Sequence, residues 1–406
     1  MTKKNNNKIK VVWLCHYSNA ELQEWIKPSK KVPEYAPWIR SMIKMFENDS
    51  SIDLHIVSQH EYLSFSQNFS NKGIHYHIVR KGLPIVGRHW PRFLKWDRWT
   101  DFIFWKRRSK KIIDRIDPDI IHMHGFENEF CSTIFQFREH YPVFITVQGF
   151  VHQSLAQSKS IDKRKLNELR IIKEFRHFGV RTKTMEKDIL AINPSAVTHW
   201  HQYPMKIPCA EPAEKIYDIV YFARLTKDKG IEDLLRAVKI IVDELNPDIK
   251  LCILGGGNIT VFKNLAEELG IGGNISWKGF LPTQQDVYNM ASKAKISVLP
   301  TYHDIISGTI IESLFLKIPV VAYNTGSIHE VNEKEPIIEL VEKFDIKGLA
   351  IAIQKLTSDK DLIEERAEKG FERVMEMFGE SDEEIRTKIL TIYNDVINQE
   401  RKADEC

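Results

Sequence analysis

Short, continuously apolar runs rich in β-branched residues alternate along the chain with segments whose apolar residues recur every three or four positions. Runs that are apolar throughout are typical of strands buried on both faces of a parallel sheet. The predicted strands are 9–15, 53–58, 74–79, 119–124, 143–148, 178–182 and 196–200 in the first half of the chain, and 217–223, 250–255, 275–280, 295–300 and 319–324 in the second. The segments between them have helical spacing. This alternation predicts doubly wound α/β sheets.

A proline-rich segment separates the two halves of this pattern. Residues 204–215 contain three prolines within nine positions, which regular structure does not tolerate. We therefore expect an N-terminal domain at 1–208 and a C-terminal domain at 209–380, each with its own sheet, and a helix within 381–406 that packs back on the first domain. Tandem α/β domains place ligands in the crevice between them, at the carboxyl ends of the strands.

The composition excludes several classes of protein. Of the 406 residues, 43% are hydrophobic and 28% are charged, as in ordinary globular proteins and unlike disordered chains. No apolar run approaches the roughly 18 residues that a membrane-spanning helix needs. The polar N-terminus lacks the apolar core of a signal peptide, so we expect a cytoplasmic chain. The five cysteines are far apart and form no C-x-x-C pair, which argues against a disulfide framework and a zinc site.

The net charge of +3 is too small to require a nucleic-acid partner, but the charge is uneven along the chain. Residues 80–111 hold eleven Lys and Arg against two Asp, and aromatic residues are interleaved among them. Such a composition is typical of segments that dock on an anionic membrane surface, here residues 82–98. The aromatic residues between Trp90 and Trp105 recur every three positions, which winds around a helix instead of marking one face. A solvated basic face is therefore the alternative to membrane docking.

The first motif with candidate chemistry is FARLTKDKG at 222–230, where a predicted strand ends and the next helix begins. Arg224 and Lys229 are separated by a short turn, so both cations can point to the same side of it. Two cations beside a helix N-terminus suit a diphosphate, because the helix dipole and the free backbone N–H groups favour anions. The alternative is a pair of solvated loop cations.

The second motif is YHDIISGTIIES at 302–313, directly after the strand predicted at 295–300. Asp304 lies in the loop, and Glu312 lies one turn into a helix predicted to begin near Gly308. A carboxylate beside a ribose accepts two hydroxyl hydrogen bonds, which is a common way to bind a nucleoside. The alternative is a surface acid and a glutamate near a helix N-terminus, where the dipole favours it.

These motifs belong to an ordered set that resembles a known family. The segments ARLTKDKG, LCILGGGN, ISWKGF, VLPTYHD with Glu312, and IPVVAYNTGSIHEV are similar, in that order, to the C-terminal domain of retaining GT-B glycosyltransferases of the glycosyltransferase family 4, or group 1, type. The similarity covers residues 215–332 closely and extends more weakly to 119–149. It implies the GT-B fold, in which two Rossmann-like, doubly wound parallel-sheet domains face each other across a cleft.

The resemblance implies roles for residues of the C-terminal domain. Arg224 and Lys229 would bind the diphosphate of a nucleotide-sugar. Asp304 would contact the donor sugar, and Glu312 the ribose. The remaining donor-binding residues would be Ser307, Gly308 and Thr309 at the β-phosphate, and Gly255, Gly256 and Lys278 at the base and ribose. The second motif departs from the family in two ways, because the first acid is usually glutamate and the usual Gly-Phe-Gly after it is Ile-Ile-Ser here.

The N-terminal domain is less similar to the family. Ser18 and Asn19 stand where relatives often have a Gly-Gly turn that approaches the phosphates. His124 ends a predicted strand, where the resemblance implies contact with the sugar; a structural histidine is the alternative. Gln148 stands where relatives often carry a second histidine, and Arg181 where they place a residue of the crevice. We assign Ser18, Asn19, Gln148 and Arg181 to the acceptor side.

We expect no obligatory metal, because Arg224 and Lys229 would supply the positive charge at the diphosphate. The sequence DPD at 117–119 imitates a D-x-D metal motif, but its proline marks a junction between a helix and a buried strand. The spacing of His16, His55, His60, His75 and His77 gives no convincing ligand set.

The resemblance and the motifs together predict a retaining glycosyltransferase of the hexosyltransferase type. It would move a sugar from a UDP- or GDP-sugar to an acceptor hydroxyl, with a saccharide or lipid-linked saccharide of surface polysaccharide biosynthesis as the acceptor. We expect it in the cytoplasm, peripheral to the inner face of the cell membrane if residues 82–98 dock there. The alternatives are a non-catalytic GT-B binding or scaffold subunit and a GT-B phosphorylase or epimerase. The small net charge argues against a nucleic-acid binder.

Overall fold

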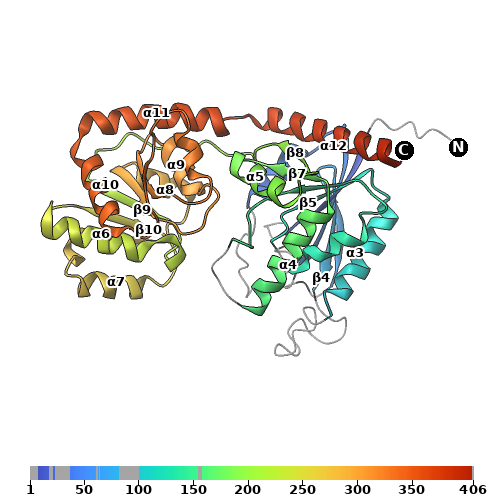
Figure 1. The fold of residues 1–406 in the computed structure, drawn as a ribbon, viewed down its shortest axis with the longest axis horizontal. Coiled ribbons are helices and arrows are strands. Elements are labelled where there is room, and N and C mark those ends of the chain that lie inside the picture. The colour runs from blue at the N-terminus through green and yellow to red at the C-terminus, as the bar shows by residue number, and fades with distance from the viewer. Residues whose placement is uncertain are drawn as a thin grey trace. The chain divides into compact units, whose positions relative to one another are not determined.

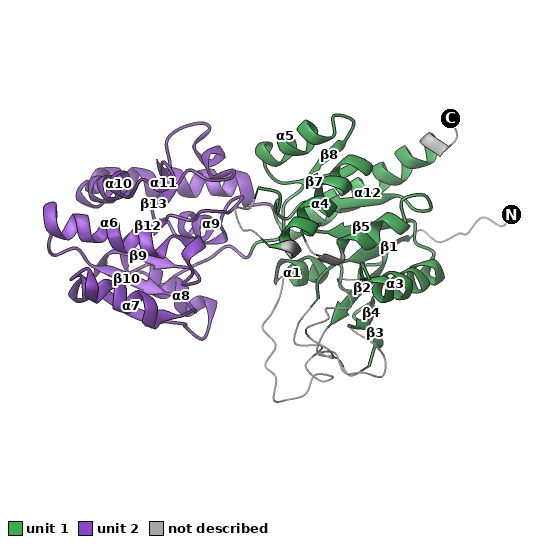
Figure 2. Ribbon diagram, turned by 60° about the horizontal axis from the view of Figure 1, so that its bottom comes forward, with its two compact units in different colours: residues 1–205, 381–406 green, residues 206–380 purple. Residues whose placement is uncertain are grey.

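The computed structural model describes residues 8–17, 22, 37–60, 63, 65–81, 100–127, 129–153 and 158–404. The chain forms two compact units (Figure 2), of which unit 1 comprises Met1–Met205 and Ser381–Cys406, and unit 2 comprises Lys206–Glu380. It passes from unit 1 to unit 2 within the proline-rich segment, and residues 201–216 form no helix or strand. Ser18, Asn19 and the candidate membrane segment 82–98 lie outside the described residues.

Unit 1 is built on an eight-stranded sheet in the order β3-β4-β2-β1-β5-β6-β7-β8 (Figure 1). Its strands are β1 Ile9–Leu14, β2 Ile52–His60, β3 Gln67–Asn71, β4 Ile74–Arg80, β5 Ile120–His124, β6 Val143–Thr146, β7 His177–Val180 and β8 Val197–Trp200. Neighbouring strands pair in parallel except β3, which runs antiparallel to β4 at the edge of the sheet. The strand β3 is not among the predicted strands, because its residues QNFSN are mostly polar.

Helices cover both faces of this sheet (Figure 1). They are α1 Pro37–Met45, α3 Ile103–Ile116, α4 Lys159–Glu174, α5 Lys183–Ile192 and α12 Asp382–Asp404, with a 3₁₀ segment at Glu129–Gln136. Although α12 is at the end of the chain, it packs on unit 1, and its residues Ile385, Ile389 and Val396 lie in the same buried cluster as Trp13 of β1.

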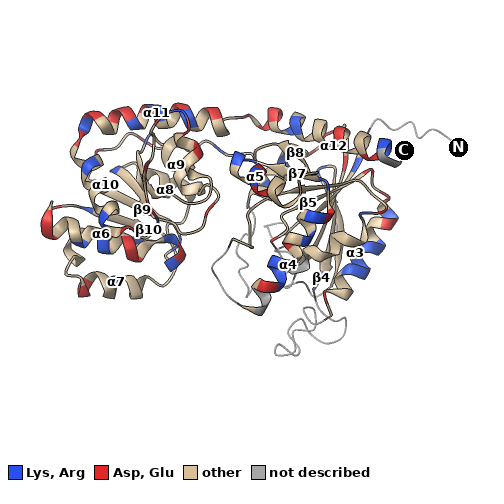
Figure 3. Cartoon of the chain, in the orientation of Figure 1, with Lys and Arg blue, Asp and Glu red and all other residues tan. Residues whose placement is uncertain are grey.

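The helix α3 presents a basic outer side (Figure 3). Trp105, Ile113 and Ile116 of this helix are buried, whereas Arg107 and Lys111 are exposed. An amphipathic helix places its apolar stripe against the core and its charges in solvent. For α3, the structure therefore has the solvated basic face that was one of the two alternatives.

Unit 2 is built on a six-stranded parallel sheet in the order β11-β10-β9-β12-β13-β14. Its strands are β9 Tyr217–Phe222, β10 Leu251–Leu254, β11 Ile275–Gly279, β12 Ala294–Leu299, β13 Val320–Tyr323 and β14 Glu339–Val341. Its α-helices are α6 Ile231–Glu244, α7 Ile259–Glu268, α8 Gln284–Ala291, α9 Gly308–Phe315, α10 Ile346–Ser358 and α11 Lys360–Phe378. None of the helices in the described part of the chain is long and apolar enough to span a membrane.

Candidate active site

Lys229 and Asp304 form an ion pair at the carboxyl-terminal edge of the unit 2 sheet. Lys229 follows β9 and Asp304 follows β12, and these two strands are neighbours. The Nζ of Lys229 donates to both carboxylate oxygens of Asp304, at 2.8 and 2.6 Å, and Thr301 Oγ1 donates to the same carboxylate at 2.6 Å. Only 12% of the Lys229 side chain and 21% of the Asp304 side chain are exposed, so solvent screens this pair less than a surface ion pair.

Two glycines allow the chain to approach this pair closely. Gly230 directly follows Lys229 with a φ of 72°, and a Cβ at this position would lie 1.9 Å from the carbonyl oxygen of Pro300. Gly326 has a φ of 55°, and its Cβ would lie 1.9 Å from the carbonyl oxygen of Asp304. Because only glycine adopts such conformations without a steric cost, both positions maintain the loops that carry the pair.

Arg224 lies in the same loop as Lys229, and its side chain is exposed. The hydroxyl of Tyr221 donates to the carbonyl oxygen of Arg224 at 3.0 Å, which fixes the backbone at this position. The guanidinium makes no hydrogen bond or ion pair with any residue that the structure describes, and it is therefore available to a ligand.

The N-terminus of α9 lies next to this loop and has no side-chain cap. Ser307 precedes the helix, but its side chain makes no capping hydrogen bond, and Thr309 Oγ1 donates to the carbonyl oxygen of Phe222 at 2.9 Å. The first N–H groups of a helix have no intrahelical acceptor, and the helix dipole favours an anion beside them. Gly308 and Thr309 therefore offer backbone donors suited to a phosphate, beside the end of β9.

Glu312, one turn into α9, is held by two side chains of α8. Tyr288 OH donates to Glu312 Oε1 at 2.9 Å, and Gln284 Nε2 donates to the same oxygen at 3.3 Å. Burial raises the pKa of Glu312 to about 7, against the opposing effect of the Tyr288 hydrogen bond. No sequence motif indicates Tyr288 or Gln284, because their contact with Glu312 depends on the packing of helices and not on spacing in a motif.

The glycine run after β10 packs against the loop that follows β9. Gly255 has a φ of 139°, and its Cβ would lie 1.9 Å from the carbonyl oxygen of Ala223. Gly256 is more open, since its Cβ would meet only the ring of Phe280, at 3.6 Å, and that ring is 79% exposed. Gly255 is therefore required by backbone packing, whereas Gly256 leaves space for a ligand beside Phe280.

Lys278 lies near the carboxyl end of β11, but its side chain reaches another part of the sheet. Its Nζ lies 6.0 Å from the ring centre of Tyr217, the first residue of β9. The ammonium therefore points toward the amino-terminal end of that strand, whereas Arg224 and Lys229 follow its carboxyl end. The contact of Lys278 with the base or ribose stays a prediction.

In unit 1, polar residues gather at the carboxyl ends of β5, β6 and β7. His124 ends β5, Gln148 follows β6, and Arg181 follows β7. Arg181 Nη2 donates to the carbonyl oxygen of Gln148 at 3.3 Å, and its guanidinium lies 4.9 Å from the ring centre of Tyr203. Burial lowers the pKa of Arg181 and raises the pKa of the neighbouring Glu127 to about 7. Tyr203 is a member of this cluster that the sequence analysis did not identify.

His124 is buried, and neither of its ring nitrogens has a hydrogen-bond partner among the described residues. Its ring centre lies 3.8 Å from that of His122 and 4.5 Å from that of Trp13. Burial lowers the pKa of His124 well below its ordinary value, so the imidazole is neutral. Buried polar atoms usually have partners, so the free nitrogens of His124 fit a residue that binds a ligand better than one with a structural role.

His122, in contrast, has both nitrogens occupied. Trp13 Nε1 donates to Tyr393 OH at 2.8 Å, and Tyr393 OH donates to His122 Nδ1 at 2.7 Å. His122 Nε2 then donates to Thr146 Oγ1 at 2.7 Å, and Thr146 donates to His201 Nε2 at 2.9 Å. This series of hydrogen bonds runs in one direction when His122 and His201 are both neutral. Burial lowers the pKa values of both histidines, in agreement with this. His122 is therefore a structural residue that connects α12 to the sheet.

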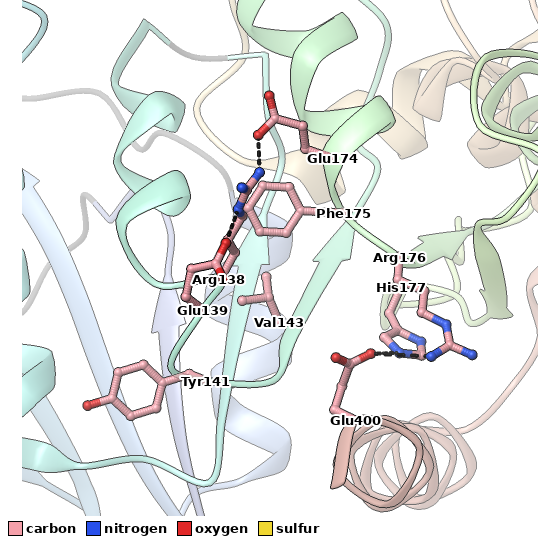
Figure 4. A pocket seen from close by; sticks show the side chains of 9 residues that line it. All are labelled: Arg138, Glu139, Tyr141, Val143, Glu174, Phe175, Arg176, His177 and Glu400. Atoms are coloured by element: carbon pink, nitrogen blue, oxygen red, sulfur yellow. Dashed lines mark hydrogen bonds and ion pairs between the residues drawn. The ribbon is translucent and has the colours of Figure 1, made fainter. Parts of the chain in front are cut away.

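A pocket of about 330 Å³ lies at the opposite, amino-terminal ends of β6 and β7 (Figure 4). Its charged side chains bind one another, since Arg138 pairs with Glu139 and Glu174, and His177 bonds Glu400 of α12 at 2.8 Å. These groups compensate each other, so the pocket fits a structural contact between α12 and the sheet.

Comparison with known proteins shows a similarity that is concentrated in unit 2. Residues 209–373 match the family model described as glycosyl transferases group 1. The chain is similar to the capsular polysaccharide biosynthesis glycosyltransferase CapM of Staphylococcus aureus, with 29% identity over 45% of this chain and 47% of the relative. It is also similar to the D-inositol 3-phosphate glycosyltransferase of Corynebacterium jeikeium, with 30% identity over 36% of each chain. These matches span less than half the length of either relative.

Two solved structures resemble the chain over almost its entire length. The sucrose-phosphate synthase of Thermosynechococcus elongatus has a TM-score of 0.70 at 17% identity and covers 96% of this chain and 100% of its own. A glycosyltransferase of Rickettsia africae has a TM-score of 0.64 at 14% identity, with 96% and 99% covered. At this identity the likeness concerns the fold. Residues 209–373 therefore match the glycosyl transferases group 1 family model, and the chain has the GT-B fold of two Rossmann-like parallel-sheet units.

Proposed function

We propose that this chain is a retaining glycosyltransferase that transfers a sugar from a nucleotide diphosphate sugar to an acceptor hydroxyl. The observation that carries the proposal is the Lys229–Asp304 pair beside the uncapped N-terminus of α9, within the segment that matches the group 1 family. The donor would bind on unit 2, with UDP or GDP as its nucleotide and without an obligatory metal.

Arg224 and Lys229 would bind the diphosphate of the donor. An ammonium group has three hydrogens, and Asp304 accepts two of the hydrogen bonds that Lys229 makes. One donor of Lys229 is thus left for a phosphate oxygen, and Arg224 adds an exposed guanidinium from the same loop. Asp304, held in place by Lys229 and Thr301, would accept hydrogen bonds from hydroxyls of the donor sugar.

Glu312 would accept the ribose hydroxyls. Its carboxylate is oriented before the nucleotide binds, because Tyr288 and Gln284 already donate to one of its oxygens. A carboxylate accepts up to about four hydrogen bonds, so two ribose hydroxyls can be added to these. The exposed ring of Phe280 beside Gly256 offers an apolar surface for the base.

The proposed reaction needs no nucleophile from the protein. The bond between the anomeric carbon and the diphosphate oxygen breaks, and the acceptor oxygen forms its bond to the same face of that carbon. The acceptor proton passes to the departing diphosphate. Arg224, Lys229 and the N–H groups of α9 would stabilise the negative charge that develops on the leaving group, which is a large contribution in preorganised sites.

The acceptor would bind residues of unit 1, where His124, Gln148 and Arg181 cluster at the strand ends. The similarity to a capsular polysaccharide glycosyltransferase supports a saccharide acceptor, and we propose a lipid-linked one used in surface polysaccharide assembly. The basic aromatic segment 82–98 would then dock on the inner face of the cell membrane. Flotation with anionic and with neutral liposomes tests this docking. We expect the protein to float with the anionic liposomes and not with the neutral ones.

The central experiment compares Arg224→Ala with Lys227→Ala. Lys227 lies in the same loop with 74% of its side chain exposed, so its removal changes the loop charge equally. We expect Arg224→Ala to lower transfer by roughly 100-fold, as for the loss of a charge-stabilising donor in other enzymes, and Lys227→Ala to leave it nearly unchanged. Full transfer by Arg224→Ala would contradict the proposal. A wild-type chain that binds a nucleotide-sugar but neither transfers nor hydrolyses it would indicate a non-catalytic subunit.

A further inference from the structure

Three potential metal ligands of unit 1 lie together on the sheet, away from the candidate active site. Asp53 and His55 are two residues apart on β2, and His75 on β4 is paired in register with His55. Residues two apart on a strand share a face, and paired residues on parallel neighbours do too. One ligand atom from each of the three residues lies within 4.8 Å of the others.

The distances within this cluster suit a small divalent cation. His55 Nε2 lies 3.3 Å from Asp53 Oδ1, and His75 Nε2 lies 3.5 Å from the same oxygen. Zinc binds nitrogen and oxygen ligands at about 2.0–2.2 Å in tetrahedral geometry, which separates neighbouring ligand atoms by about 3.4 Å. The ligand atoms of the two histidines also lie within 4.8 Å of each other, so a small adjustment of the 42% exposed His75 side chain would bring its Nε2 to that separation from His55 Nε2.

The other nitrogen of each imidazole is already bound. His77 Nδ1 donates to Asn68 Oδ1 at 2.9 Å, because an amide oxygen can only accept. The Nε2 of the neutral His77 therefore accepts from His55 Nδ1 at 3.1 Å. His75 Nδ1 and Ser70 Oγ share a hydrogen bond of 2.7 Å. In the tautomer in which His75 Nδ1 is the donor, both Nε2 atoms carry lone pairs, and both lie near the carboxylate of Asp53. This is the outer-shell arrangement that orients histidine ligands toward a metal, and a cation between the three atoms removes the repulsion of their lone pairs.

We propose that Asp53, His55 and His75 form a binding site for a divalent transition metal ion of the zinc type, with water completing the coordination. Two imidazoles and one carboxylate with an open position are a ligand set that zinc accepts. The neighbouring cation Lys10 does not occupy the site, because its Nζ donates to the carbonyl oxygen of Ile116 at 2.9 Å.

The position of the site indicates a structural role. Asp53 and His75 are the second residues of β2 and β4, so the site lies at the amino-terminal ends of the strands. His124, Gln148 and Arg181 lie at the carboxyl-terminal ends of their strands. A metal here would hold β2 and β4 together near the edge of the sheet, and sugar transfer would proceed without it.

The test uses the full chain without a histidine tag, freed of metal by a chelator and titrated with Zn²⁺ and with Co²⁺. We expect one ion per chain, a higher melting temperature with Zn²⁺, and the visible absorption of tetrahedral Co²⁺ without a sulfur charge-transfer band. The missing band excludes the exposed Cys209 as a ligand.

Variants then identify the ligands. We expect His75→Gln and Asp53→Asn to weaken Zn²⁺ binding by at least about tenfold, and His77→Gln, which removes an outer-shell partner, by about 10–100-fold. The control His140→Gln removes an exposed histidine and should bind like the wild type. Because Asp53 and His75 are partly exposed, melting curves without metal should match the wild type. Wild-type binding no tighter than that of His75→Gln, or no bound ion at all, would overturn the proposal.

Discussion

The carboxyl group of Glu312 changes its charge near neutral pH, because burial raises its pKa to about 7. A carboxyl group with a higher pKa in the folded state than in the unfolded state stabilises the fold most at low pH. This contribution is lost as the pH rises through the folded-state pKa. The ionised form that ribose hydroxyls would need thus predominates only above about pH 7, where it costs stability in the free protein.

Glu312→Gln should therefore have opposite effects on stability and on nucleotide binding. We expect the free variant to melt a few degrees above the wild type at about pH 8.5, with a smaller difference at about pH 5.5. Nucleotide affinity of the wild type should fall as the pH drops below about 7, and the variant should bind weakly at all pH values. Titrations with UDP and GDP at both pH values test this, with the exposed Glu268→Gln as control. Wild-type affinity that rises at low pH would refute the role of Glu312.

The partly buried pair of Lys229 and Asp304 should also be measurable as stability. We expect Lys229→Ala to destabilise unit 2 by about 1–3 kcal/mol, because Asp304 would keep a charge with only Thr301 as a hydrogen-bond donor. The double variant Lys229→Ala/Asp304→Asn should recover part of the loss. Urea unfolding of the single and double variants gives the coupling energy.

An exposed ion pair of the same unit is the control for this prediction. Lys239 and Asp243 pair on α6 at 2.7 Å, with 37% and 47% of their side chains exposed. Lys239→Ala should cost less than about 0.5 kcal/mol, since such helix pairs contribute little. If Lys229→Ala and Lys239→Ala lowered the free energy of unfolding equally, burial would add nothing to the stability that the Lys229–Asp304 pair contributes.

Residues of the candidate site differ in how far a sequence can indicate them. Arg224, Lys229 and Asp304 lie in the loops that follow β9 and β12, and parallel strands place such loops at one edge of a sheet. The contact of Tyr288 with Glu312 depends on how two helices pack, and no spacing encodes it. The cluster of Asp53, His55 and His75 depends on the register between β2 and β4, so counting histidines along the chain did not identify it.

At the level of elements, α12 is bound to unit 1 by a buried chain of hydrogen bonds as well as by apolar packing. Tyr393 is fully buried, and its hydroxyl accepts from Trp13 of β1 and donates to His122 of β5. Buried polar groups in such a chain are stable only when every member has its partner. A single hydroxyl on α12 thus satisfies polar groups on two strands of the sheet.

Tyr393→Phe should therefore destabilise unit 1 without changing its fold. The substitution leaves Trp13 Nε1 and His122 Nδ1 without partners, and each unsatisfied group costs about 1–3 kcal/mol. We expect a loss of about 2–4 kcal/mol in the free energy of unfolding, measured by urea denaturation with tryptophan fluorescence. The control Tyr141→Phe removes a hydroxyl at the partly exposed Tyr141, which makes no hydrogen bond to a described residue, and should cost little. Equal stability of Tyr393→Phe and wild type would show that water replaces the hydroxyl.

The strands that could be predicted from the sequence are those whose residues form a continuous apolar run. All twelve predicted strands are present, and most of them consist mainly of buried residues. The two strands not predicted, β3 and β14, are short and partly polar, and they lie at the ends of their sheets. The end strands β8 and β11 were predicted, so it is the shortness and polarity of β3 and β14, and not their edge position alone, that hides them from hydropathy.

At the level of the whole molecule, the division into units is not a division of the chain into two consecutive pieces. Unit 1 takes its last helix from Ser381–Cys406, after the chain has completed unit 2. Six apolar residues of α12 lie in the core of unit 1: Ile385, Ile389, Ile392, Tyr393, Val396 and Ile397. Unit 2, in contrast, is formed by one continuous segment with its own sheet.

Truncation after Glu380 should thus destabilise unit 1, although it is distant in sequence from the deleted residues, and leave unit 2 intact. Without α12, the core of unit 1 would be exposed to water, and its unfolding temperature should fall or its cooperative transition disappear. Unit 2 would keep its own core, so residues 1–380 should still bind the nucleotide that the full chain binds. Calorimetry and limited proteolysis of the two chains, with and without that nucleotide, separate the two transitions, because a ligand raises the stability only of the unit that binds it. An intact unit 1 transition in the truncated chain, or loss of the unit 2 transition, would contradict this dependence.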